Sequence, residues 1–148
     1  MFIFSENIKA FVLKNEFQMK EILKEYNYSI LNIPKIVIFE DKSKWGYFNS
    51  EINVIGLSHR LIYLANDTFV IYTLKHEIAH YLTFLKHGSK VQSHGKEYKT
   101  VCETIGADPS AKVKLNNVKG QEVSDKSINI VNKIQKLLKL ADSSNSNE

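Results

Sequence analysis

One stretch of the sequence has residue types and spacing that suit metal chemistry: the motif H-E-x-x-H, formed by His76, Glu77 and His80. On a helix, histidines four residues apart lie about 40° apart around the axis and about 6 Å apart along it, so both imidazoles can bind one ion. Glu77 follows the first histidine directly, where its carboxylate can act on a water at the ion without occupying the ion itself. The pattern indicates a zinc hydrolase and is most typical of a metallopeptidase.

The residues around the motif predict the helix that it needs. We expect this helix to begin near residues 66–68, with Asp67 as its N-cap, and to end at Gly88. One stripe of the helix is apolar and consists of Ile71, Leu74, Ile78, Leu82 and Leu85. Further apolar residues extend around most of the helix, which is typical of a buried helix. A chance pair of surface histidines is the alternative interpretation, and these apolar flanks argue against it.

A catalytic zinc site takes three protein ligands and a water, so the motif needs a third ligand. His87 lies on the same helical face, but about 13 Å beyond the midpoint of the pair, which is too far for a shared ion. His94 follows a polar connection that lets the chain turn back, and it opens a second predicted helix over residues 94–105. A thermolysin-like site would instead use a glutamate of that helix, Glu97 or Glu103.

The remaining elements predict an α+β fold. We expect an N-terminal helix over residues 5–28, followed by a small three-stranded antiparallel sheet from a strand at 35–39 and a hairpin at 45–57. A short helical segment at 59–65 contains His59, which we interpret as a structural or surface residue. The sheet precedes the active-site helix and the helix that bears the third ligand.

An aromatic cluster lies in the first strand of the predicted hairpin. Trp45, Tyr47 and Phe48 stand beside two lysines, an arrangement that would suit a platform for stacking nucleic-acid bases. Such clusters more often form sheet core, and we favour that interpretation. We also expect an extended substrate to add as a strand at the edge formed by residues 52–57.

Composition limits the class of protein. With 148 residues, of which 43% are hydrophobic, the chain is expected to form one globular domain with a small appendage. Its single cysteine, Cys102, excludes an intramolecular disulfide and a cysteine-rich zinc ribbon, and it favours a reducing compartment. No signal-peptide pattern or membrane-length apolar run is present, so we predict a cytoplasmic protein without a membrane partner. The net charge of +4 is compatible with a nucleic-acid partner.

The two histidine motifs together resemble a known family. H-E-x-x-H, a short connection and then H-G-x-x-aromatic, which begins at His94 and ends at Tyr98, are similar to the SprT-like family, which includes the Spartan DNA-dependent proteases. The similarity covers roughly residues 10–110, and the strand residues 46–48 and 55–58 also resemble that family.

This resemblance implies a minimal zincin with zinc ligands His76, His80 and His94, a general base Glu77 and a packing role for Tyr98. It further implies protein substrates that are bound or crosslinked to DNA, with single-stranded or junction DNA as a candidate partner. The chain lacks the C-terminal zinc ribbon of many relatives. Two functions remain open as alternatives: a processing protease specific for one regulatory protein, and a zinc-bearing binding module without turnover.

The sequence divides into two predicted units. Residues 1–116 form the metallopeptidase domain, with a short strand predicted around Val113 and Leu115. Residues 117–148 form an amphipathic helix and a disordered Ser/Asn-rich tail. The helix resembles the start of a helical domain of unknown function found beside some SprT-like domains. Its apolar stripe would pack on its own domain or contact a protein partner.

Overall fold

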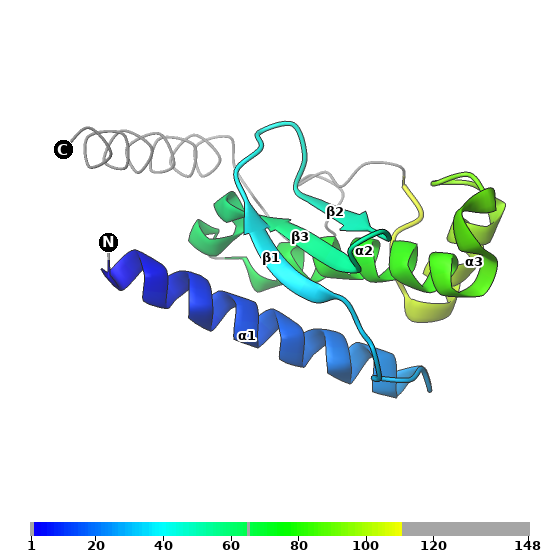
Figure 1. The fold of residues 1–148 in the computed structure, drawn as a ribbon, viewed down its shortest axis with the longest axis horizontal. Coiled ribbons are helices and arrows are strands. Elements are labelled where there is room, and N and C mark those ends of the chain that lie inside the picture. Colours follow the sequence, from blue (N-terminus) through cyan, green and yellow to red (C-terminus); the bar gives the residue numbers. More distant parts are fainter. Residues whose placement is uncertain (1, 65, 111–148) are drawn as a thin grey trace.

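The computed structural model describes residues 2–64 and 66–110, and their arrangement is shown in Figure 1. The elements in chain order are α1 (Phe2–Glu25), β1 (Lys35–Phe39), β2 (Gly46–Asn49), β3 (Val54–Ser58), the 3-10 helix η1 (His59–Tyr63), α2 (Asp67–His87), the 3-10 helix η2 (Gly88–Lys90) and α3 (Lys96–Ile105). Helix α1 runs along β1, and α2 lies behind the other two strands (Figure 1). The predicted α+β fold is confirmed.

The sheet has three strands, as predicted, but its pairing differs from the prediction. Its order is β1-β3-β2, with β2 antiparallel and β1 parallel to β3 (Figure 1). The expectation of an entirely antiparallel sheet was therefore wrong. The chain reverses once between β1 and β2 and again in the tight turn before β3, so β3 returns in the direction of β1 and fills the space between them.

The central position of β3 follows from its sequence. Ile55, Gly56 and Leu57 are buried in succession, as expected for a strand covered on both faces. Gly56 lies opposite Tyr47 of β2, and a Cβ atom on Gly56 would lie 2.1 Å from the Tyr47 ring. The glycine thus lets the Tyr47 ring lie directly against the central strand.

The core is formed where the three helices meet the sheet. Its buried apolar side chains include Met19 and Leu23 of α1, Phe69, Leu74 and Ile78 of α2, and Tyr98, Val101 and Ile105 of α3. Helix α3 therefore packs on α2 through one whole face, and this contact fixes the segment that precedes α3. None of the described helices is long and apolar enough to cross a membrane.

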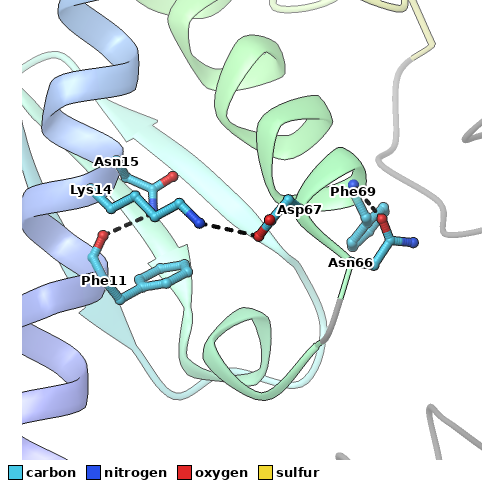
Figure 2. Close-up of polar contacts among 6 residues, drawn as sticks. All are labelled: Phe11, Lys14, Asn15, Asn66, Asp67 and Phe69. Atoms are coloured by element: carbon cyan, nitrogen blue, oxygen red, sulfur yellow. Dashed lines mark hydrogen bonds and ion pairs between the residues drawn. The ribbon is translucent and has the colours of Figure 1, made fainter.

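Figure 2 shows the polar contacts at the start of α2 and on the neighbouring part of α1. The Asn66 side chain accepts a hydrogen bond from the Phe69 N–H at 3.1 Å, which makes Asn66 the N-cap in place of the predicted Asp67. Asp67 is instead the first helical residue, and its carboxylate lies 3.2 Å from Lys14 Nζ of α1. On α1, Asn15 Nδ2 donates to the Phe11 carbonyl at 2.9 Å.

The C-terminal predictions fall on residues that the structure does not describe. The strand expected around Val113 and Leu115 and the second unit, residues 117–148, both lie outside the described ranges. Those two expectations stay predictions.

Candidate metal centre

The structure brings the three predicted histidines together. His76 and His80 lie one turn apart on α2, and their ring centroids are 5.0 Å apart. His94 lies in the turn before α3 and is not part of that helix, which begins at Lys96. Each histidine offers one ring nitrogen as a ligand atom, and these three nitrogens lie within 4.8 Å of one another. Such a set could hold one metal ion.

The path of the chain after α2 explains how His94 reaches the other two. Gly88, with φ +70°, ends α2 in a backbone conformation that favours glycine, and η2 then turns the chain back. Helix α3 is anchored on α2 by its buried face, so the preceding turn is held over the α2 histidines. The Nε2 atoms of His80 and His94 approach to 3.1 Å, and both therefore face the same point.

The alternative ligands stay outside the cluster. His87 is exposed in the last turn of α2, as its distance along the helix predicts. Glu97 is half-buried and Glu103 exposed on α3, and neither belongs to the histidine group found in residues 2–64 and 66–110. His59 is buried against Tyr63 with ring centroids 5.3 Å apart, which agrees with a structural role.

Burial keeps the histidine cluster in its neutral form. Loss of solvation lowers the pKa of His76 to about 4 and that of His80 to about 3, with a further contribution from the other histidines. Burial also lowers the pKa of His94. At neutral pH each ring therefore keeps a nitrogen lone pair, which is the form that binds a metal ion.

Glu77 lies beside this cluster and is only 3% exposed. Burial raises the pKa of its carboxyl group to about 8, and the positive charge of Lys44 opposes this shift. The carboxylate lies directly against the first residue of β2: a Cβ atom built on Gly46 would be 3.0 Å from Glu77 Oε1 and 3.1 Å from Glu77 Cγ. Gly46 thus provides the space that the Glu77 side chain occupies.

A cleft of about 600 Å³ opens in front of these groups. Its walls come from the segment 43–48, from α2 and from the segment between η2 and His94. Strand β2 is an outer strand that lines this cleft, whereas β3, where we expected substrate to pair, has neighbours on both sides. The expected docking edge at residues 52–57 was therefore wrong.

Arg60 supports the segment before β2, which forms one wall of the cleft, and its sequence context did not indicate this role. It is 7% exposed, and its guanidinium group donates to the carbonyl oxygens of Lys42 at 3.2 Å and Lys44 at 3.3 Å. The same group lies over the Trp45 ring, 3.9 Å from its centroid. Trp45 also packs edge-on against Phe69 of α2, so this half-buried ring lies against the core on one side and lines the cleft on the other.

Three histidines and a buried glutamate around an H-E-x-x-H helix are the arrangement found in metallopeptidases. The model of the SprT-like family matches residues 16–122, and the chain belongs to this family. Family membership supports a metallopeptidase.

The chain is also similar to the crystal structure of the metallopeptidase zymogen of Methanocaldococcus jannaschii jannalysin. The TM-score is 0.43 and the sequence identity 18%, and the similarity covers 82% of this chain and 92% of that chain. Among curated proteins, none matches the chain.

Proposed function

We propose that the protein is a zinc-dependent metalloendopeptidase, with His76, His80 and His94 as the metal ligands and Glu77 as the general base. The observation that supports this most strongly is the set of three histidine nitrogens within 4.8 Å of one another, with the buried Glu77 next to it in the sequence. Three neutral imidazoles suit zinc, which in catalytic sites takes three protein ligands. Bound zinc would supply a Lewis acid and a water acidified toward neutral pH.

The protein's own groups would do the rest of the chemistry. The histidines stay neutral at neutral pH because burial lowers the pKa of each, so they bind without first losing a proton. Burial alone would keep the Glu77 carboxyl group protonated at pH 7, because it raises the pKa to about 8, but the positive charge of a bound ion would lower that pKa again. As a carboxylate, Glu77 would then take a proton from the attacking water and pass it to the amine that leaves when the peptide bond breaks. Because Gly46 has no side chain, the Glu77 carboxyl group lies directly against β2, beside the cleft.

An extended peptide would bind along β2. This strand lies at the outside of the sheet and lines the cleft, so its outward backbone groups are placed to pair with a peptide in β conformation. The peptide would then cross the histidine cluster in front of α2. Neutral and apolar residues, among them Phe48 and Phe84, form much of the remaining wall.

The variant Glu77→Gln tests the assignment of the general base. It should bind zinc with the same stoichiometry as the wild type, because the ligands are unchanged, and its peptide hydrolysis should fall by roughly 10²-fold or more. Glu97→Gln and Glu103→Gln are matched controls that remove a carboxylate from α3 outside the cluster, and both should keep wild-type activity. Undiminished hydrolysis in Glu77→Gln would refute the assignment, and loss of zinc in either control would favour a glutamate ligand.

The substrate class is a further part of the proposal. We propose proteins bound or crosslinked to DNA as substrates, on the basis of the similarity to Spartan-type proteases and the net charge of +4. Cleavage of a DNA-binding protein should be measured with and without single-stranded DNA, and with Glu77→Gln in parallel. Cleavage that requires both DNA and Glu77 is expected. Cleavage that ignores DNA would instead favour a processing protease for one regulatory protein.

A further inference from the structure

Tyr98 of α3 contacts all three histidines of the cluster, although packing alone was expected of it. It is 0% exposed, and its hydroxyl oxygen lies 2.9 Å from His76 Nδ1. Its ring stacks on His80 with centroids 4.3 Å apart and an interplanar angle of 22°. The ring is also edge-on to His94, with centroids 5.1 Å apart. One buried side chain therefore supports each of the proposed ligands.

The contact with His76 bears on which nitrogen of that ring is left for an ion. The Tyr98 hydroxyl lies against Nδ1, so Nε2 is the nitrogen that stays available. An imidazole that binds an ion through Nε2 carries its proton on Nδ1, and the lone pairs of the Tyr98 oxygen can accept that Nδ1–H.

The direction of this hydrogen bond decides which nitrogen of His76 can bind a metal. A neutral imidazole carries one N–H, so a proton on Nδ1 leaves the lone pair of Nε2 free. The opposite direction, with the phenol donating to Nδ1, would put the proton on Nε2 and block it. Partners of this kind on the second nitrogen commonly fix the orientation of a metal-binding histidine.

We propose that Tyr98 is a positioning residue of the metal centre: it holds His76 in the Nδ1–H tautomer, so that Nε2 faces the ion, and its ring fixes the plane of His80. This inference rests on the proposed function, because it takes His76 and His80 as ligands. It goes beyond that function by giving a buried phenol a role in metal affinity.

The main test is Tyr98→Phe, which removes the hydroxyl and keeps the ring. Zinc affinity, measured by competition with a chromophoric chelator, should fall about 10- to 100-fold, the usual effect of losing such a partner. Tyr81→Phe is the matched control, because Tyr81 is a buried tyrosine of α2 whose ring packs on Phe48. Its zinc affinity should stay within twofold of the wild type. Unchanged affinity in Tyr98→Phe would overturn the proposal.

A second measurement follows the tautomer directly in metal-free protein. Imidazole ¹⁵N NMR should show His76 protonated at Nδ1 in the wild type and a substantial Nε2–H population in Tyr98→Phe. A wild-type His76 protonated at Nε2 would refute the proposal. If the wild type bound no zinc, the proposed function would fail, whereas this measurement would still decide the role of Tyr98.

Discussion

Because Glu77 is the proposed general base, Gly46→Ala should impair catalysis while metal binding at the proposed site stays unchanged. The new Cβ atom would lie 3.0 Å from Glu77 Oε1, 3.1 Å from Glu77 Cγ and 3.1 Å from the Gly56 carbonyl oxygen. The Gly56 oxygen belongs to the backbone of the central strand and cannot withdraw. The strain therefore falls on the Glu77 side chain, which must move away from β2.

The size of the effect follows from these distances. Ordinary contact begins at 3.4 Å, so a carboxylate oxygen at 3.0 Å has to move by 3.4 − 3.0, or about 0.4 Å. A misplacement of about 1 Å in an active site can cost about 100-fold in rate, so this shift predicts a loss of about 5- to 10-fold in kcat. That is about 1 to 1.4 kcal/mol of activation free energy. Complete loss of a general base costs roughly 10² to 10⁴, which sets the upper limit.

The assay is steady-state peptide hydrolysis, together with zinc titration, on four proteins: wild type, Gly46→Ala, Glu77→Gln and the double variant. Zinc affinity should be the same in all four, because the nearest neighbours of the new methyl group are Glu77 and Gly56. In the Glu77→Gln background, Gly46→Ala should change the residual rate by less than twofold, since both substitutions act on one group. An equal loss in both backgrounds would refute the reasoning.

Two further predictions concern the buried groups around the site. Arg60→Met should lower the free energy of unfolding by about 2 to 4 kcal/mol in a denaturant titration, because the carbonyl oxygens of Lys42 and Lys44 lose their donor. Arg60→Lys should recover less than half of this loss, since one ammonium group cannot reproduce the contacts of the planar guanidinium group. Full recovery in Arg60→Lys would contradict that explanation. Burial raises the pKa of the Cys102 thiol above its usual value, so alkylation of the native protein by iodoacetamide should stay slow as pH rises through 9 and become fast only in denaturant. Rapid alkylation of the folded protein at pH 8 would show that this thiol is accessible.

Much of the site could be predicted because its signals are local. The apolar flanks of H-E-x-x-H predicted the helix almost to its ends, and α2 indeed runs from Asp67 to His87. The polar connection before His94 was long enough for a reversal, and the structure places His94 beside His80. The family resemblance extended these signals and agrees with the match over residues 16–122.

The parts that could not be predicted depend on contacts between distant segments. The sheet order required knowing that β3 is buried on both faces, which its continuous apolar run only suggests. Gly46 and Glu77 meet through the packing of β2 on α2, and an isolated glycine in a strand indicates a close approach without naming the partner. The hydroxyl of Tyr98 was missed for a similar reason, because an aromatic residue on a buried helix face is expected to pack.

The anchoring of α3 has a consequence for how a metal ion would be taken up. His80 and His94 are separated by 14 residues, and in a flexible chain an ion would have to bring them together against the entropy of that loop. Here the burial of Val101 and Ile105 already holds α3 on α2, and so keeps His94 at a high effective concentration near its partners. We therefore expect the packing of α3 to close this loop during folding. An ion at the proposed site would then bind without a slow ordering step.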